Sequence, residues 1–439
     1  MTVLYLLVEE SFRELASRQI IAADCLSKGL QIVIAQQWWF NDHMADLPPG
    51  IVLFKGNNRI QGTLMRATKN HGHLITSIEE EAFGVTFEAE LATMFSPTAM
   101  DVVDMVFAQG TRHRDFLVKR FAAMNDRVAV TGNPRSDVIS LSGGLLINEK
   151  AENLRREIGD FVLVNTNCGA INPYDIDTYS HFMRCKSVGV LEPSDPADMI
   201  RFESLLAWEH SNLREISRFL RTFAEKNPRV PVIVRPHPAE NLGRWKKACE
   251  RLSNVTVEND TDHIAWMLAA RVILHTGCTT GLEGALLGTP VVGICPDEND
   301  WHAGFISNLV SHVYRTGAEV SDVVGDHLSP GKPDIPSLSS EDLERLQPSL
   351  YVQNSRRASA RMAEVFGHLA TRLIGARSTT DLDHLTKFRQ PLAGRRCKKA
   401  FVSLDDFQKS WASVGKSLNF HQAVSVKELA PAVFLMKAA

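Results

Sequence analysis

Two short stretches of the chain carry residue types that commonly bind phosphate. His237 stands between two prolines, directly after the apolar run 232–234. The second stretch, 276–281, reads Thr-Gly-Cys-Thr-Thr-Gly and lies where a helix should begin. A helix N-terminus offers unpaired N–H groups and a partial positive charge, and glycine lets a phosphate approach the backbone closely. We therefore expect an anion site here, although an ordinary capped helix and an exposed histidine would give the same pattern.

Alternating strands and helices must position these residues. The apolar runs 232–234, 272–274 and 291–294 predict buried strands, and Gly288 and Pro290 end the helix between the last two. Ligands of open parallel sheets bind at the carboxyl ends of the strands. Both stretches are therefore expected at that edge of one sheet. Glu283, in the first turns of the helix, is near enough to accept hydrogen bonds from the sugar hydroxyls of a phosphorylated ligand.

Two further polar turns follow predicted strands. The stretch 165–169 reads Asn-Thr-Asn-Cys-Gly, and its amides and glycine turn could hold the carboxylate or phosphate of a substrate. A plain Asx turn is the alternative. The second turn, Gly-Asn-Pro-Arg at 132–135, ends in Arg135, which could pair with an anion or serve a structural turn. The predicted substrate-binding residues are Arg135, Asn165, Asn167 and Gly169.

Three consecutive glutamates, Glu79, Glu80 and Glu81, end the predicted strand 74–78. An acidic run at an exposed helix start simply complements the helix dipole. Within a cleft, repulsion between the carboxylates would raise the pKa of one of them and suit it to general acid or base chemistry. Both interpretations stay open on the sequence alone.

Composition limits the class of protein. The chain has 439 residues, 44% of them hydrophobic and 23% charged, with a net charge of −3. These values are typical of a soluble globular protein and give no argument for a nucleic-acid partner. Seven cysteines occur without a CxxC pair, so we expect neither disulfides nor a metal site. The N-terminus predicts a first strand rather than a leader, which favours a cytoplasmic protein.

Length and pattern predict an α/β fold with two doubly wound, Rossmann-like domains and a C-terminal extension. We expect the domains at 1–145 and 146–345, a crossover helix at 346–375 and a basic tail at 376–439. The tail has eleven Lys or Arg against five Asp or Glu. Its cluster at 395–399 could bind anionic lipid headgroups at the inner membrane, and a solvated tail is the alternative.

Taken together and in order, these motifs resemble a known family. They are 13–15 (Arg-Glu-Leu), 79–81, 132–135, 165–169, 235–238 (Arg-Pro-His-Pro) and 275–283. Over roughly residues 1–375 the chain resembles the bacterial surface carbohydrate biosynthesis proteins. These are GT-B glycosyltransferases related to the retaining β-Kdo transferases and, more distantly, to bacterial sialyltransferases.

The resemblance implies a metal-independent glycosyltransferase with two facing domains and no cofactor besides its CMP-sugar donor. It would transfer a nonulosonic acid such as Kdo to a glycan or glycolipid acceptor of capsule or lipopolysaccharide. A glycine is common where Ala82 stands, so the choice among the three glutamates stays open. The implied catalytic residues are Glu80 or Glu81, with Asp175 in reserve. The implied nucleotide contacts are His237, Pro238, Thr276, Gly277, Thr279, Thr280 and Glu283.

Two alternatives belong to other classes. An enzyme like UDP-GlcNAc 2-epimerase would share the two-domain fold and a Gly/Ser-rich loop followed by Glu. It would need a diphosphate site and acid–base carboxylates beside the sugar. A non-catalytic subunit of a polysaccharide assembly complex would have no need of the polar strand ends.

Overall fold

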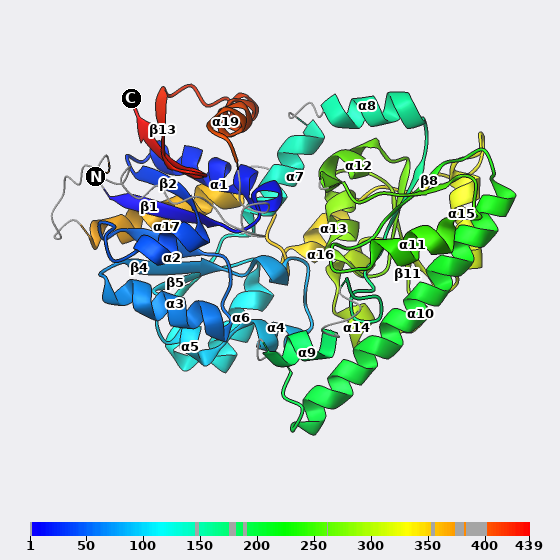
Figure 1. The fold of residues 1–439 in the computed structure, drawn as a ribbon, viewed down its shortest axis with the longest axis horizontal. Helices are drawn as coiled ribbons and strands as arrows, with labels where there is room; N and C mark the ends of the chain where they lie inside the picture. The colour runs from blue at the N-terminus through cyan, green and yellow to red at the C-terminus, as the bar shows by residue number, and fades with distance from the viewer. Residues whose placement is uncertain are drawn as a thin grey trace. The chain divides into compact units, whose positions relative to one another are not determined.

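The computed structural model describes residues 2–144, 149–174, 181–187, 191–260, 262–352, 356–373, 382 and 402–439. The chain divides into two compact units (Figure 1). Unit 1 comprises Met1–Phe83, Leu91–Leu146 and Leu346–Ala439, and unit 2 comprises Gly84–Glu90 and Ile147–Arg345. Each unit is a mainly parallel sheet with helices on its faces, which confirms the predicted α/β class of two Rossmann-like units.

Among the described residues of unit 1, eight strands form one sheet in the order β13-β14-β2-β1-β3-β4-β5-β6. Strands β1 to β6 are parallel, because helices on both faces return the chain to the same edge each time. All six residues of β1 are buried, as such a central strand requires. The bounds are β1 Val3–Val8, β2 Gln31–Gln36, β3 Ile51–Phe54, β4 Leu74–Ile78, β5 Met105–Ala108, β6 Val128–Val130, β13 Val424–Ala430 and β14 Val433–Ala438.

Helices cover both faces of this sheet. Leu4 and Leu6 of β1 share one core cluster with Ile21 of α1 and Phe366 of α17. The segments are α1 Ser11–Leu26, α2 Gln37–His43, α3 Arg59–Asn70, η1 Glu80–Ala82, α4 Glu88–Met94, α5 Pro97–Met100, α6 Thr111–Arg120, η2 Ala122–Met124, α7 Pro134–Gly144, α17 Ala358–Thr371 and α19 Leu404–Leu418.

The C-terminal part of the chain differs from its prediction as a tail. Its described residues form α19, β13 and β14, and β14 pairs antiparallel with β2. Phe434 of β14 is buried and stacks on Phe407 of α19 at 4.0 Å between ring centroids. This segment therefore completes the core of unit 1. The basic cluster at 395–399 lies outside the described residues, and the predicted crossover helix is interrupted, since α17 begins only at Ala358.

The sheet of unit 2 has six parallel strands in the order β12-β11-β10-β7-β8-β9. The strands are β7 Val162–Asn165, β8 Val232–Arg235, β9 Val255–Val257, β10 Val272–His275, β11 Val291–Ile294 and β12 His312–Tyr314. The chain builds the sheet outward from β7 in one direction and then outward from β10 in the other. The strand order thus reverses between β7 and β10, where ligands of such sheets bind.

Two core clusters cover the two faces of the unit 2 sheet. On one face α10 packs through a stripe at helical spacing, which includes Trp208, Asn212, Ile216, Phe219 and Phe223. Asp195 caps the helix by accepting from Ala197 N–H, and Pro196 starts it. The segments are α8 Glu149–Ile158, α9 His181–Ser187, α10 Pro196–Lys226, α11 Leu242–Cys249, α12 His263–Ala269, α13 Thr279–Leu286, α14 Asp300–Ala303, η3 Ile306–Leu309, α15 Gly317–His327 and α16 Ser340–Leu346.

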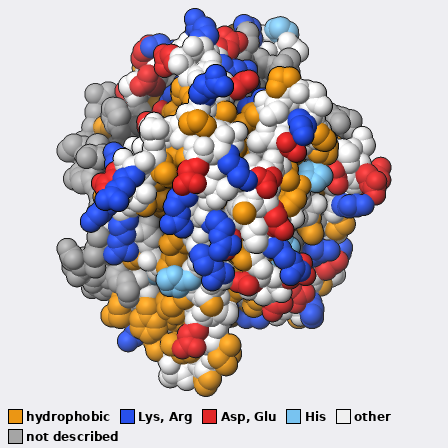
Figure 2. Space-filling model, turned by 90° about the vertical axis from the view of Figure 1, so that its right-hand side faces the viewer, with side chains coloured by type: hydrophobic (Ala, Val, Ile, Leu, Met, Phe, Trp, Pro, Cys, Tyr) orange, Lys and Arg blue, Asp and Glu red, His pale blue; other side chains and the backbone are white. Residues whose placement is uncertain are grey.

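The surface mixes side chains of all kinds. On the face that Figure 2 shows, Lys and Arg side chains are interspersed with Asp and Glu, and apolar groups gather toward one end. Charges of both signs on one face leave no extended field of a single sign there. Across the described part of the chain, every helix is too short or too polar to cross a lipid bilayer.

Candidate functional site

The carboxyl edge of the unit 2 sheet brings together the three predicted polar stretches of this unit. Asn165 ends β7 and His275 ends the neighbouring β10, with Val164 opposite Leu274 in the register between them. His237 follows β8, which pairs with the other side of β7. The stretches 165–169, 235–238 and 275–280 therefore start from three adjacent strands. This edge contains the point where the strand order reverses.

His275 shapes the loop that leads into α13. Its Nδ1 accepts a hydrogen bond from Gly277 N–H at 3.0 Å, so the proton of the neutral ring is on Nε2, 2.8 Å from Ser311 Oγ. Burial lowers the pKa of His275 to about 3, and the imidazole is neutral near pH 7. The ring is thus a fixed part of the loop, and as a neutral group it cannot form an ion pair with a phosphate.

Gly277 needs both its conformation and its lack of a side chain. Its φ is +76°, in the left-handed region. A Cβ atom there would stand 3.2 Å from Asn308 Nδ2 and 3.2 Å from the Trp208 ring. Trp208 is itself held in a stack, 5.8 Å from the Phe305 ring centroid. The turn therefore rests on a packed aromatic and amide floor.

The loop presents hydrogen-bond donors at its end. The N-cap residue of α13, Cys278, makes no side-chain cap hydrogen bond, and the N-terminus of a helix carries a partial positive charge. Thr279 and Thr280 form the first turn. Thr276 Oγ and Asn165 Nδ2 are buried and have no hydrogen-bond partner among the described residues. An unpaired buried polar group costs about 1–3 kcal/mol, so a ligand that pairs with these atoms would gain affinity.

Two buried glutamates hold the surrounding loops. Glu240 accepts from Thr166 Oγ1 at 2.6 Å and from His237 N–H at 3.0 Å. Glu209 of α10 accepts from the N–H groups of Ala170 and Ile171 at 2.9 and 3.0 Å. Burial raises the pKa of Glu209 to about 8. Neither glutamate was predicted from the sequence; Glu240 has a local signal, three residues after His237, whereas Glu209 has none.

The remaining predicted residues of this unit have different environments. The His237 ring is exposed and its Nδ1 accepts from Ala239 N–H at 3.1 Å, while Pro238 beside it is also exposed. Asn167 and Gly169 are half-buried in their loop. Glu283 is fully buried, with Oε2 3.0 Å from His263 Nε2, so in this structure it faces that histidine rather than solvent. Asp175 lies outside the described residues.

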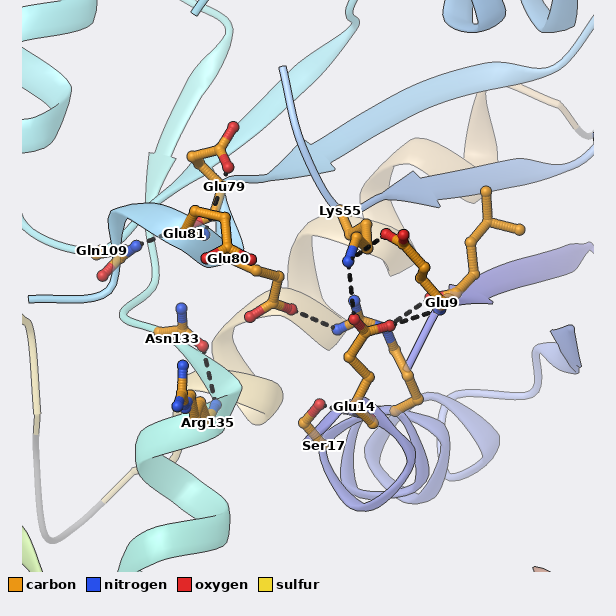
Figure 3. Close-up of polar contacts among 12 residues, drawn as sticks. Glu9, Glu14, Ser17, Lys55, Glu79, Glu80, Glu81, Gln109, Asn133 and Arg135 are labelled. Carbon is orange, nitrogen blue, oxygen red and sulfur yellow. Dashed lines mark hydrogen bonds and ion pairs between the residues drawn. The ribbon is translucent and has the colours of Figure 1, made fainter. Parts of the chain in front are cut away.

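The carboxyl edge of unit 1 carries the glutamate run, and its three members differ (Figure 3). Glu79 is buried and accepts from Asn57 N–H at 2.9 Å. Burial raises its pKa to about 8, and the charge of Glu81 adds to that rise. Glu80 accepts from Arg18 Nη1 at 2.9 Å, whereas the Glu81 side chain is 61% exposed and lies 3.8 Å from Arg13. The side chain with the perturbed pKa is therefore Glu79, which was not one of the two predicted.

Other charged groups on this edge are paired within the unit. Lys55 Nζ lies 2.6 Å from Glu9 and 3.0 Å from Glu14, an ion cluster that no local sequence pattern predicts. The predicted anion contact Arg135 places its guanidinium over the Phe83 ring, 5.0 Å from the centroid. Within the described ranges, no group of three or more His, Cys, Asp or Glu side chains is arranged to hold a metal ion.

The fold has counterparts among solved structures. A UDP-N-acetylglucosamine 2-epimerase is 12% identical and aligns over 90% of this chain and 99% of its own, with a TM-score of 0.50. The Neisseria meningitidis UDP-GlcNAc 2-epimerase bound to UDP-GlcNAc is also 12% identical, over 85% and 100%, with a TM-score of 0.49. A wall teichoic acid polymerase is 8% identical, over 85% and 90%, with a TM-score of 0.45.

The chain has the two-domain GT-B-like fold. This confirms the predicted fold class. At such identities the likeness concerns the fold alone. No protein-family model and no curated protein sequence matches the chain.

Proposed function

We propose that this protein is an enzyme that acts on a nucleotide sugar, and that the nucleotide binds at the carboxyl edge of the unit 2 sheet. The observation that carries the proposal is the set of donors around the Gly277 turn. Asn165 Nδ2 at the end of β7 and Thr276 Oγ1, directly after β10 and before α13, are buried without a partner among the described residues. Phosphate oxygens accept hydrogen bonds from such donors and from a helix N-terminus.

Two versions of the proposal differ in nucleotide and reaction. The sequence motifs favour transfer of a CMP-activated ulosonic acid, such as Kdo, to an acceptor glycan or glycolipid of a bacterial surface polysaccharide. The other version is an enzyme like UDP-GlcNAc 2-epimerase, which needs no acceptor. A solved structure that shares the fold at a TM-score of 0.50 is such an epimerase, which supports the second version more than the first.

Our candidates for the acid–base group in either version are the glutamates at the carboxyl edge of the unit 1 sheet. Glu80 and Glu81 stay our predicted catalytic residues. Glu79 joins them, because a carboxyl with a pKa of about 8 is mostly protonated near neutral pH and can donate a proton. A purely structural subunit would have no use for unpaired buried donors at a strand end.

Calorimetric titration of the full chain with UDP, CDP and CMP tests nucleotide binding. We expect either the uridine nucleotide or the cytidine nucleotides to bind. Thr276→Val should weaken that binding by about five- to tenfold, since one hydrogen bond is lost. Thr256→Val makes the same chemical change at an exposed position of β9 and should leave affinity unchanged. Failure of all three nucleotides to bind would sink the proposal.

The reaction is tested with sugar derivatives of the nucleotide that binds. Incubation with UDP-GlcNAc and no acceptor, followed by proton NMR, should yield the 2-epimer if the second version holds. Binding of CMP alone, with no change in UDP-GlcNAc, would support the transferase version instead.

A further inference from the structure

A buried carboxyl group holds the loop 166–174, which follows β7 in unit 2. Glu209 of α10 is 5% exposed, and its Oε2 accepts from Ala170 N–H at 2.9 Å and from Ile171 N–H at 3.0 Å. The two N–H groups lie in a turn that Asn172 N–H closes by donating to Cys168 O at 2.9 Å. The carboxyl group of Glu209 therefore fastens this turn to α10.

The groups around Glu209 do not compensate a negative charge. Its charged neighbour is Glu240, which is also a buried carboxyl group. Cys168 lies near as well, and burial raises the pKa of its thiol well above the usual range, so it stays neutral. Within the described ranges, no cationic side chain pairs with Glu209. An ionised Glu209 would thus be a buried charge without a counter-ion, which is costly.

Glu215, further along the same helix, shows the contrasting arrangement. It is buried to a similar degree and also accepts from a backbone group, Gly317 N–H, at 3.1 Å. Its carboxylate lies 3.2 Å from Arg214 and 3.0 Å from Arg218. A buried glutamate of α10 can therefore be paired with cations, and Glu209 is not.

The protonation of Glu209 is linked to the closure of the loop. Burial raises its pKa to about 8, and the charge of Glu240 adds to the rise, while the two N–H groups oppose it. In an open loop the carboxyl group would meet water and regain its ordinary pKa of about 4.5. Closing the loop therefore takes up a proton between these values. In that window each rise of one pH unit favours the open loop by about tenfold.

We propose that Glu209 is a protonation-dependent latch of the loop 166–174: the neutral acid holds the loop closed, and the carboxylate lets it open. Oε2 accepts from both N–H groups, so Oε1 carries the proton in the closed state. The loop contains Asn167 and Gly169, so the latch makes the shape of this edge of the unit 2 sheet depend on pH. The inference stands apart from the proposed function, because the motion needs no ligand.

Amide hydrogen exchange of the full chain, followed by NMR, tests the latch. The protection factor compares the observed exchange rate with the intrinsic rate at the same pH, so base catalysis of exchange is already removed. Between about pH 5 and about pH 7, protection of the Ala170 and Ile171 N–H groups should fall by about a hundredfold.

Three substitutions on α10 separate the latch from other effects of pH. Glu209→Gln keeps an oxygen that can accept from both N–H groups and has no proton to lose, so protection should be independent of pH. Glu209→Leu removes the acceptor, so protection should be low at every pH. Glu215→Gln makes the same chemical change at the carboxylate that arginines pair with, and it should leave the fall in place.

Two results would overturn the inference. One is a constant protection factor in the unmodified chain between about pH 5 and about pH 7. The other is an equal fall in Glu209→Gln, since the titrating group would then lie elsewhere. Thermal melting checks that the variants are folded, and if Glu209→Gln is not, the same fall in Glu209→Leu refutes the latch in its place. The proposed function is judged separately, by nucleotide binding.

Discussion

Replacing Gly277 with alanine should destabilise unit 2 for two separable reasons. A left-handed alanine costs about 1–2 kcal/mol relative to glycine, and the φ of Gly277 is +76°. The new Cβ would also press on Asn308 and Trp208 at 3.2 Å. Neither neighbour yields freely, because Asn308 Nδ2 donates to His302 O at 2.7 Å and Trp208 is stacked on Phe305. Crowding of this kind adds about 1–3 kcal/mol.

Gly288→Ala isolates the first cost. Gly288 has a φ of +80° in the same unit, with no atom within 4 Å of an added Cβ. Urea unfolding followed by tryptophan fluorescence should give a loss of about 1–2 kcal/mol for Gly288→Ala and about 2–5 kcal/mol for Gly277→Ala. Nucleotide affinity should fall only in Gly277→Ala. Equal losses in the two variants would refute the reasoning that Trp208 and Asn308 form a rigid floor.

Three further predictions concern burial and protonation. Burial holds the folded-state pKa of His275 at about 3, so protonation at acid pH favours the unfolded chain. The free energy of unfolding should therefore fall by about 1.4 kcal/mol per pH unit below about pH 6.5. The prediction is contradicted if the unmodified chain and His275→Asn lose stability in parallel between about pH 6 and pH 4. The raised pKa of Glu79 gives the opposite pH dependence. Its contribution to the stability of unit 1 is complete below about pH 4.5 and is lost as the pH rises toward about 8. Glu79→Gln matches the protonated shape and should stabilise unit 1 by about 4 kcal/mol near pH 8, with a much smaller effect near pH 5. An equal effect at both pH values argues against a titrating Glu79. Phe434→Ala should lower the free energy of unfolding in urea by about 3–5 kcal/mol, since it removes a buried ring of the core. Ser425→Ala, at an exposed position of β13, is the control. A negligible cost of Phe434→Ala would mean that β13 and β14 are not part of the core.

The strand ends of unit 2 were predictable because their signals are local. Short runs rich in Val and Ile, bounded by Gly and Pro, predicted β7, β8 and β10. Parallel topology then requires that their carboxyl ends meet at one edge. The residues around Gly277 therefore came together as expected.

Other features depend on contacts that no local pattern contains. Glu79, Glu80 and Glu81 are chemically identical in the sequence, and only the fold buries Glu79 against Asn57 and leaves Glu81 exposed. Residues 376–439 were interpreted from their charge surplus, whereas the hydrophobic residues of β14 pair with a strand about four hundred positions earlier. Glu209 binds backbone groups 38 and 39 residues away. Such pairings follow from the tertiary structure.

The late strand β14 has a consequence for synthesis on the ribosome. It lies between β13 and β2 in the sheet of unit 1, so β2 remains an unpaired sheet edge until β14 has emerged. The last residues assigned to unit 2 precede Leu346, so that unit can close first although unit 1 begins the chain. An open edge of buried, β-prone residues in a nascent chain invites intermolecular pairing. Translation of this protein therefore passes through a stage at which all of unit 2 has been made while unit 1, which begins the chain, still lacks two strands of its sheet.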